Sequence, residues 1–522
     1  MSDTFWQGLA MVIYLGGMLA IGWWSYRKTH NLDDYMLGSR DLSPAVAALS
    51  AGAADMSGWL LMGLPGAIYT AGLMEGWIAV GLTVGAWCNW KYVAPRLRSY
   101  TQVANNSITV PSFLENRLHD RSRLLRIASG LIILTFFTFY VSSGMVAGGV
   151  FFQSSFGMDY RTGMLIVAAV EIAYTLFGGF LAVSYTDFVQ GLLMVSALIL
   201  VPILGVAAVG GFGGLADGIN AADSAAGLDR FGITPATGAA WIGLISALAW
   251  GLGYFGQPHI VVRFMALRSV AEAKAGRRIG IGWMLFSVLG AIATALVGVA
   301  YVQQHPEIVL DKAGETVYIR LGQILFHPLI AGFMLAAVLA AIMSTVSSQL
   351  LVTSSALVED IYKAMGRDDR SDAHYVLMGR LAVLGVSLVA IALAWQQNDT
   401  IMRLVSFAWA GFGAAFGPII LLSLYWRRLS AMGALVGMVS GAVIVGVWGT
   451  LRKAAVGGVF DLYEMVPGFL ACLLIAVLVS KATYRPDPAI DAEFDASLAE
   501  LDEFHAADSG DVAAATTYGA GA

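Results

Sequence analysis

The sequence predicts an all-α polytopic membrane protein, and three observations support this. The 522-residue chain is 58% hydrophobic and only 12% charged, whereas soluble globular domains have about 25% charged residues. Its apolar residues gather into runs of about 20, the length with which an α-helix crosses the hydrocarbon core of a bilayer. Two of these runs, 51–66 and 250–259, contain Gly and Pro, which weaken helical hydrogen bonding.

Thirteen such runs divide the chain. The first, 5–24, has no basic residue before it and Arg27 and Lys28 after it, a charge order that argues against a cleavable signal peptide. The predicted spans centre near Leu15, Ser57, Gly85, Tyr140, Ala169, Ala197, Ala249, Val288, Ala340, Val386, Gly413, Val439 and Leu473.

The basic residues predict the orientation. With the N-terminus outside, 23 of the 30 Lys and Arg, including the five in 263–278, lie in cytoplasmic loops, which fits the positive-inside rule. The Gly- and Asp-rich segment 210–239 then reads as an external loop, with a short re-entrant helix as an option. After Arg485 there are nine acidic residues and no basic one, which predicts a disordered, solvated cytoplasmic tail.

The run 51–66 cannot remain a regular helix, and it has Asp55 near its middle. One interpretation is that Asp55 pairs with a neighbouring helix while the glycines serve packing. The other is a discontinuous helix whose opened carbonyls bind a cation and whose amides and side chains bind a solute.

The run 250–259 repeats the pattern about two hundred residues later and ends near Pro258. Ordinary proline kinks are the alternative, but paired interrupted spans in two halves indicate a transporter's binding site.

Hydroxyls cluster in the ninth span, within 340–349. A Ser or Thr in a helix commonly bonds to the carbonyl one turn back. Ser344 and Thr345, with the Ala341 carbonyl beside them, could instead present oxygens to one point, as a hard cation requires. Further oxygens could come from the opened backbone near Ala53 and Met56.

Four aromatic residues lie in the middle of predicted spans: Trp59, Tyr140, Trp250 and Tyr254. Core packing is the simple interpretation. Trp250 and Tyr254 are four residues apart and share a helix face. With Pro258 they would form an apolar, ring-lined wall suited to a small ring-bearing solute.

Two acidic residues and two cysteines complete the candidates. Asp187 follows Thr186 where the sixth span opens, so it is either a helix N-cap or an acid on a cation's route to the cytoplasm. The position of Glu171 inside the fifth span indicates only that its carboxylate forms a buried pair or contacts water. Cys88 and Cys472 lie in apolar runs and support neither a disulfide framework nor a metal cluster.

Three stretches carry a resemblance to a known family: Ala-Asp-Met-Ser-Gly-Trp-Leu-Leu-Met-Gly-Leu-Pro-Gly at 54–66, Thr-Leu-Phe-Gly-Gly-Phe-Leu-Ala-Val-Ser-Tyr-Thr-Asp-Phe-Val-Gln at 175–190, and Ile-Met-Ser-Thr-Val-Ser-Ser-Gln at 342–349. The chain resembles the sodium:solute symporter family over 5–484, with the tail outside the resemblance. The resemblance implies thirteen transmembrane helices and a leucine-transporter-type core of two inverted five-helix repeats. The expected division is a first helix and loop (1–40), a first repeat (41–210), an external loop (211–239), a second repeat (240–428), two further helices (429–484) and the tail (485–522).

The resemblance also implies roles for individual residues. Sodium would bind the carbonyls of Ala53, Met56 and Ala341 and the hydroxyls of Ser344 and Thr345, with Asp187 on its internal route. Asp55 would be essential for sodium-coupled binding. The positions that match proline-binding residues are Ser57, Trp59, Tyr140, Trp250, Tyr254 and Pro258. Ala54 departs from the Ser expected in close relatives, and the lost hydroxyl bears on substrate contacts.

The expected function is sodium-coupled import of L-proline across the inner (plasma) membrane by alternating access, without enzymatic chemistry or nucleic-acid binding. One alternative has the same architecture with another amino acid or a carboxylate as solute. A transporter-like sensor is a second, although the tail is too short for a signalling domain. A channel is a third, which paired interrupted spans favour less than alternating access.

Overall fold

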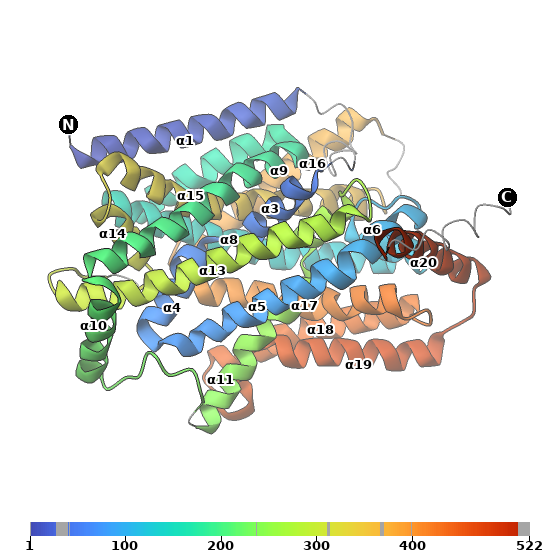
Figure 1. Cartoon of the computed structure of the whole chain (residues 1–522). Coiled ribbons are helices and arrows are strands. Elements are labelled where there is room, and N and C mark those ends of the chain that lie inside the picture. The colour runs from blue at the N-terminus through green and yellow to red at the C-terminus, as the bar shows by residue number, and fades with distance from the viewer. Residues whose placement is uncertain are drawn as a thin grey trace.

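The chain folds into a helical bundle in the computed structural model, which describes residues 2–27, 40, 42–235, 237–310, 314–365, 370–397 and 399–509. In these ranges the regular structure is helical, apart from one bridge between Leu42 and Leu267. The long helices lie side by side, with the N-terminus at one end of the bundle and α20 (Pro488–Ser509) beside the other (Figure 1). The prediction of an all-α chain is confirmed.

The described part of the chain contains nine helices that are long and apolar enough to cross a membrane, and a tenth if one bent pair is counted as a single span. All thirteen predicted centres lie on a helix or, for Ser57, at a helix break. The uninterrupted long helices are α1 (Asp3–Tyr26), α8 (Leu124–Phe156), α13 (Glu272–Gln304), α15 (Pro328–Ser355), α16 (Asp372–Ala394), α17 (Ile401–Tyr425), α18 (Ala431–Lys453) and α19 (Met465–Thr483).

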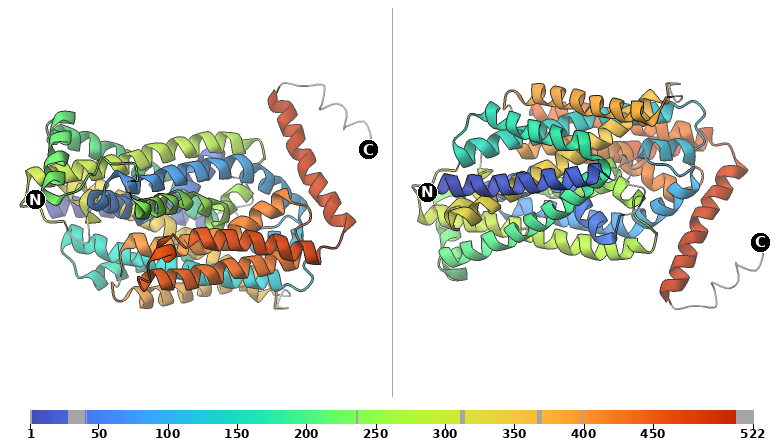
Figure 2. Two further views of the ribbon diagram at one scale, coloured as in Figure 1. Left: turned by 90° about the horizontal axis from the view of Figure 1, so that it is seen from below. Right: turned by 90° about the horizontal axis from the view of Figure 1, so that it is seen from above.

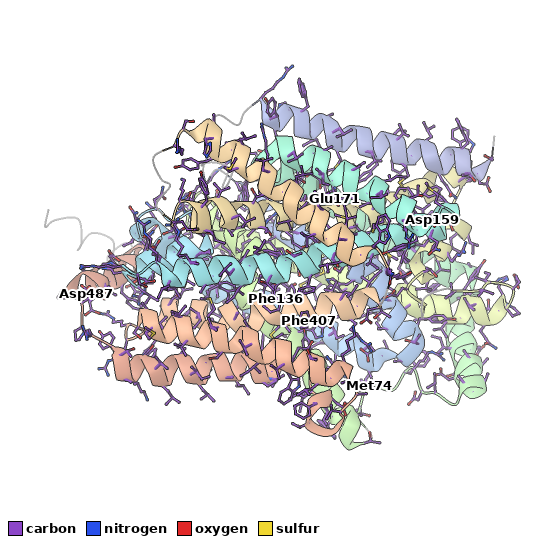
Figure 3. The ribbon with its side chains drawn as sticks, turned by 180° about the vertical axis from the view of Figure 1, so that it is seen from behind. Met74, Phe136, Asp159, Glu171, Phe407 and Asp487 are labelled. Atoms are coloured by element: carbon purple, nitrogen blue, oxygen red, sulfur yellow. The ribbon has the colours of Figure 1, made fainter. Side chains whose placement is uncertain are left out.

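The helix α9 (Tyr160–Ala208) contains both the fifth and the sixth predicted span. Its 49 residues would extend about 74 Å if straight, far more than the ~30 Å hydrocarbon core. Gly179 interrupts it with φ 61° and ψ −164°, a conformation that favours Gly. Asp159, which precedes α9, and α10 (Gly211–Ala226), which follows it, lie at the same end of the bundle (Figures 1 and 3). The chain therefore reverses direction at Gly179, and α9 consists of two helices, one on each side of this residue.

Three further spans are interrupted rather than short. The second span consists of α3 (Pro44–Asp55), a π-helical turn η2 (Trp59–Gly63) and α4 (Leu64–Ala71), and its halves are bent by 60°. The third consists of α5 (Trp77–Cys88), the π turn η4 (Asn89–Val93) and α6 (Ala94–Val103). The seventh consists of α11 (Gly238–Ala249), the 3₁₀ segment η5 (Trp250–Gly256) and α12 (Pro258–Met265). The two breaks expected from Gly and Pro are confirmed.

Glycine allows α5 and η5 to approach closely. A Cβ atom on Gly85 would lie 2.2 Å from the carbonyl oxygen of Gly251, and one on Gly251 would lie 2.2 Å from the oxygen of Gly81. Neither position can therefore accept a side chain without moving the backbone. Small residues at helix contacts in membranes permit this backbone-to-backbone packing, which places η5 beside the third span.

The segment expected as an external loop contains α10. This helix lies across the end of the bundle (Figure 1) and packs on α13, where Gly218 faces Ala300. Arg230 fixes the loop that follows, because it binds Asp223 at 2.5 Å and donates from Nε to the Tyr69 carbonyl at 2.9 Å. The segment therefore contains a helix, which lies over the end of the bundle.

The prediction of a disordered tail is wrong for 488–509, while 510–522 lie outside the described residues. These residues form α20, which crosses the bundle end at a steep angle (Figure 2). Phe494 is 4% exposed and Leu501 5% exposed, and the Ser99 hydroxyl donates to the Ser497 carbonyl at 2.8 Å. The acidic composition obscured an apolar stripe at helical spacing, 494–498–501, which buries itself on α6.

Candidate functional site

The site begins where α3 stops. In a continuous helix the amide of Ser57 would donate to Ala53 and the amide of Leu60 to Met56. Here the Ser57 amide donates to the Asp55 carbonyl at 2.9 Å, and the Leu60 amide donates to the Ser57 carbonyl at 3.0 Å. The carbonyl oxygens of Ala53 and Met56 are therefore released from the helical pattern, as the sequence predicted.

The middle of α15 meets these released carbonyls. The Ser344 hydroxyl lies 2.7 Å from the Ala53 oxygen and 3.2 Å from the Ala341 oxygen, and the Thr345 hydroxyl lies 3.5 Å from the Ala53 oxygen. All these residues are buried. Residues separated by almost three hundred positions thus present neutral oxygens to one another, which is the donor set that a hard cation prefers.

The described residues contain no group of three or more His, Cys, Asp or Glu that could hold a metal ion. A site for zinc or another transition metal needs such ligands. The cluster of α3 and α15 offers backbone carbonyl and hydroxyl oxygens instead, which are the ligand type of a hard cation.

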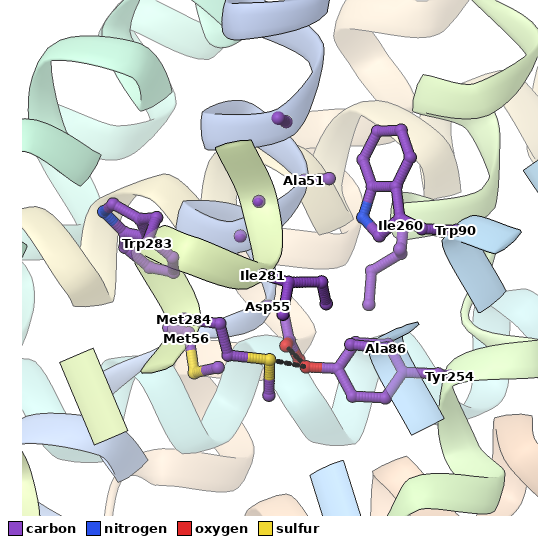
Figure 4. Close-up of a pocket in the computed structure, with 13 residues that line it drawn as sticks. Ala51, Asp55, Met56, Ala86, Trp90, Tyr254, Ile260, Ile281, Trp283 and Met284 are labelled. Carbon is purple, nitrogen blue, oxygen red and sulfur yellow. Dashed lines mark hydrogen bonds between the residues drawn. The ribbon is translucent and has the colours of Figure 1, made fainter. Parts of the chain in front are cut away.

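Asp55 lies directly beside the break and is 1% exposed. One carboxylate oxygen accepts a hydrogen bond from the hydroxyl of Tyr254 on η5, while the other has no hydrogen-bond partner in the described part of the chain. Figure 4 shows the Tyr254 hydroxyl between this carboxylate and the Met284 sulfur, at the edge of a narrow cavity that Trp90 and Trp283 also line. An incompletely bonded buried carboxylate makes the region attractive to cations.

Aromatic rings surround the other side of the break. Trp59 on η2 lies 6.1 Å from Trp250 between ring centroids, and Trp250 stacks on Trp409 at 6.4 Å and on Tyr463 at 5.5 Å. Tyr254 meets Trp409 edge-on at 5.3 Å. The Trp409 indole also donates to the Trp250 carbonyl at 2.8 Å, so α17 fixes the shape of η5.

The other three predicted substrate residues, Ser57, Tyr140 and Pro258, differ in their position relative to this cluster. Ser57 is at the break itself, and Tyr140 on α8 is buried, with its ring edge-on to His259 at 6.1 Å. The Tyr140 hydroxyl has no partner at full hydrogen-bond geometry among the described residues, although the Ser57 side chain lies close enough to interact with it. Pro258 starts α12 and lines a separate cavity with α7 (Val110–Arg117) and α8, so the structure does not place it among the stacked rings.

Asp187 is not a helix N-cap, because α9 continues through it. Its Oδ2 accepts from the Ser50 hydroxyl at 2.8 Å, the Arg263 guanidinium at 3.0 Å and the Ser348 hydroxyl at 3.3 Å. The sequence prediction of Arg263 in a cytoplasmic loop is wrong, because Arg263 lies on α12 and is fully buried. The pair compensates both charges, which a membrane interior requires, and it ties α9 to α12 near the oxygen cluster.

Sequence reasoning missed Trp409 and Tyr463. Trp409 lies in an apolar run that reads as ordinary core, and Tyr463 lies outside the predicted span centres. Only the Trp-Ala-Gly-Phe-Gly pattern at 409–413 could have signalled a close helix approach, since Gly253 and Gly413 allow η5 and α17 to touch.

Comparison with known proteins gives consistent results. The model of the "Sodium:solute symporter family" matches residues 35–441. The chain is 59% identical to the "High-affinity proline transporter PutP" of Bacillus subtilis (strain 168), over 91% of this chain and 98% of that protein. It is 49% identical to the "Sodium/proline symporter" of Staphylococcus aureus (strain JH9), over 94% of this chain and 96% of that protein.

Solved structures show the same fold. A sodium-coupled sialic acid symporter in a substrate-bound outward-open state superposes with a TM-score of 0.77 at 20% identity, covering 93% of this chain and 99% of that one. The nucleobase-cation-symport-1 transporter MHP1 superposes with a TM-score of 0.52 at 16% identity, covering 90% and 100%.

Proposed function

This chain belongs to the sodium:solute symporter family, and we propose that it imports L-proline together with sodium. It is a multi-pass membrane transporter and not an enzyme. The observation that supports the proposal most is the meeting of Ser344 with the released Ala53 carbonyl at 2.7 Å, because it joins a cation donor set to the broken helix that also carries the aromatic cluster. The proline transporters at 49–59% identity are the reason for naming proline.

Sodium acts in this proposal as a co-substrate. Its ligands are the carbonyl oxygens of Ala53, Met56 and Ala341 and the hydroxyls of Ser344 and Thr345, with the Asp55 carboxylate supplying negative charge nearby. Asp187, held between Ser50, Ser348 and Arg263, marks the route from this cluster to the cytoplasm. The membrane potential drives entry, since one charge crossing 100 mV contributes about 2.3 kcal/mol.

Proline binds beside the break, between Ser57 and the rings of Trp59, Tyr140, Trp250 and Tyr254. A five-membered apolar ring needs flat apolar walls, and the ammonium and carboxylate need polar groups at the ends. The Tyr140 hydroxyl and the Ser57 side chain lie close enough to interact, so together they offer polar groups to the substrate. Pro258 acts further along the path, where α12 begins.

The topology completes the proposal. The N-terminus lies outside and α20 inside, with inverted repeats over 41–210 and 240–428 that place the breaks of the second and seventh spans at equivalent positions. The basic residues support this direction.

The experiment is uptake of radiolabelled L-proline into proteoliposomes. Uptake above the passive rate is expected only with an inward sodium gradient, and a negative interior potential should accelerate it. Uptake that follows a proton gradient and ignores sodium would contradict the proposal.

A further inference from the structure

The membrane-spanning helix α9 contains a carboxylic acid to which the proposed transport assigns no role. Glu171 lies in the first half of α9, away from the bundle end at which Asp159 lies (Figure 3), and is 0% exposed. Neither of its carboxyl oxygens has a hydrogen-bond partner among the described residues. An ionised carboxylate in such surroundings is costly, and it takes up a proton when no cation neutralises it.

The reversal of α9 brings a second acid to the same depth. Glu171 is eight residues before Gly179, and Asp187 is eight residues after it. At about 1.5 Å per residue, both acids are about 12 Å from the reversal, and their carboxylates interact electrostatically. Thr175 and Ser184 lie between this level and the reversal, and their buried hydroxyls also lack a partner in the described structure.

Among the described residues, one cation faces these two acids. Arg263 donates to Asp187 Oδ2 at 3.0 Å. The hydroxyls of Ser50 and Ser348 donate to the same oxygen. These bonds favour the ionised form of Asp187, so Arg263 neutralises Asp187 and leaves no positive charge for Glu171. A buried water would supply a hydrogen bond to Glu171 but would not remove its negative charge.

Two tyrosines near Glu171 direct their hydroxyl protons elsewhere. Tyr14 of α1 and Tyr174 of α9 interact electrostatically with Glu171. The Tyr14 hydroxyl donates to the Met343 sulfur at 3.7 Å, and the Tyr174 hydroxyl donates to the Met343 carbonyl at 3.0 Å. Neither hydroxyl therefore stabilises an ionised Glu171.

The other described elements packed on α9 bring no further charge that interacts with Glu171. The helix α15 has no acidic or basic residue, and those of α8 and α13 lie in the first two turns of each helix. Arg380 of α16 donates to the Leu176 carbonyl at 3.0 Å, and Asp55 of α3 is bonded to Tyr254. The neutral, protonated form of Glu171 is therefore the one that these surroundings favour.

We propose that Glu171 is a proton-binding site and that a sodium ion on the route marked by Asp187 displaces this proton to the cytoplasm. The inference rests on the proposed function of sodium-coupled import. The sodium ion brings a second positive charge to the two acids, so Glu171 ionises and the total charge of the buried group is unchanged. The O–H bond breaks, its electron pair stays on the carboxylate, and the proton leaves past Thr175 and Ser184 toward the reversal at Gly179.

The test compares two glutamate-to-glutamine variants of the full chain. Glu171→Gln keeps this side chain neutral at every pH, whereas Glu115→Gln removes a carboxylate of α7 that Arg126 already neutralises at 2.9 Å. A pH-indicator dye reports proton release when sodium is added to weakly buffered protein, with potassium as the blank. Equilibrium proline binding gives the sodium concentration for half-maximal binding at each pH.

We expect the unmutated protein and Glu115→Gln to release about one proton per molecule when sodium binds, and Glu171→Gln to release none. In the unmutated protein the half-maximal sodium concentration should rise by up to about tenfold for each unit by which the pH falls. In Glu171→Gln it should not change with pH. Infrared difference spectra of the unmutated protein should lose a carboxylic-acid carbonyl band when sodium is added, and this measurement tests the proposal even if Glu171→Gln fails to fold.

Three results would overturn the proton site. Equal proton release in Glu171→Gln and the unmutated protein would place the proton on another group. A half-maximal sodium concentration that is constant with pH in the unmutated protein would mean that sodium and protons do not compete. A carboxylic-acid band that persists in sodium would mean that Glu171 keeps its proton. Proton release is measured without proline, so proline binding that ignores sodium would overturn the proposed function separately.

Discussion

Single hydrogen bonds decide whether the backbone at the α3 break is available to an ion. The Ser57 amide bonds to Asp55 instead of Ala53, so a shift of one amide partner releases the carbonyl that Ser344 approaches. Sequence alone indicated the weak helix, because Gly and Pro are visible in it. It could not show which amide moves, since that depends on packing against α15.

Ser344→Ala should raise the sodium concentration for half-maximal proline uptake by about 10- to 100-fold, the range for losing one hydrogen bond to a charged group. At saturating sodium, proline affinity should recover most of its normal value. The measurement is uptake titrated over sodium. Thr353→Ala is the matched control, because that hydroxyl is buried on the same helix and, within the described part of the chain, bonds to the Gln349 carbonyl alone. An equal shift in the control would contradict a local role.

Tyr254→Phe should weaken sodium-dependent proline binding and lower the thermal midpoint, because it removes the hydroxyl that donates to Asp55. Leaving a buried carboxylate without its donor costs about 1–3 kcal/mol. Tyr318→Phe removes another buried Tyr hydroxyl, which donates to the Met334 carbonyl at 3.3 Å, and should leave sodium dependence unchanged. Binding titrations on both variants check this, and a sodium dependence identical in Tyr254→Phe and the unmutated protein would exclude the hydroxyl from coupling.

At the scale of helices, α20 shows how one apolar stripe outweighs surface charge. The Arg427–Asp495 ion pair joins side chains that are 44% and 59% exposed, and such pairs contribute about 0–1 kcal/mol. Phe494 is buried beneath Arg117 and Arg427 and meets Tyr100 edge-on at 5.9 Å. Burying a Phe side chain stabilises by about 1.5–3 kcal/mol, so the ring contributes more to docking than this ion pair does.

Phe494→Ala should therefore release α20 from α6 without unfolding the bundle. Limited proteolysis within 488–509 should accelerate by roughly 10- to 100-fold, the factor that corresponds to losing a buried Phe, while the thermal midpoint of the bundle changes little. Asp502→Ala, an exposed position on the same helix, is the control. Equal cleavage rates in the two variants would indicate that charge, and not the ring, docks the helix.

Over the whole molecule, the sequence predicted where helices and breaks lie better than which residues meet. Hydrophobic run length placed every predicted centre on a helix or, at Ser57, at a helix break, because the bilayer fixes that length. The Asp187–Arg263 pair joins positions that are 76 residues apart. The sequence alone placed Arg263 in a cytoplasmic loop, because no local pattern distinguishes a buried Arg from a cytoplasmic one. The stacking of Trp250 on Trp409 and Tyr463 likewise depends on how α17 packs, which periodicity does not specify.

Sodium and proline should each tighten binding of the other by the same factor. Ala53, Asp55, Ser57 and Trp59 lie on one interrupted span, so an ion at the released carbonyls orders the backbone that positions the substrate groups. Thermodynamic linkage requires equal factors for equilibrium binding, and couplings of about 1–3 kcal/mol, or 5- to 150-fold, are typical. Equilibrium proline binding measured over a range of sodium, and sodium binding measured over a range of proline, should give matching values, with lithium and potassium as controls. Because Trp250 lies in the aromatic cluster and not among the cation's oxygens, Trp250→Ala should lower proline affinity while sodium binding without proline stays nearly constant. A proline affinity that is flat across sodium but changes with pH would mean that the coupling ion is a proton and that the oxygen cluster of α3 and α15 is structural.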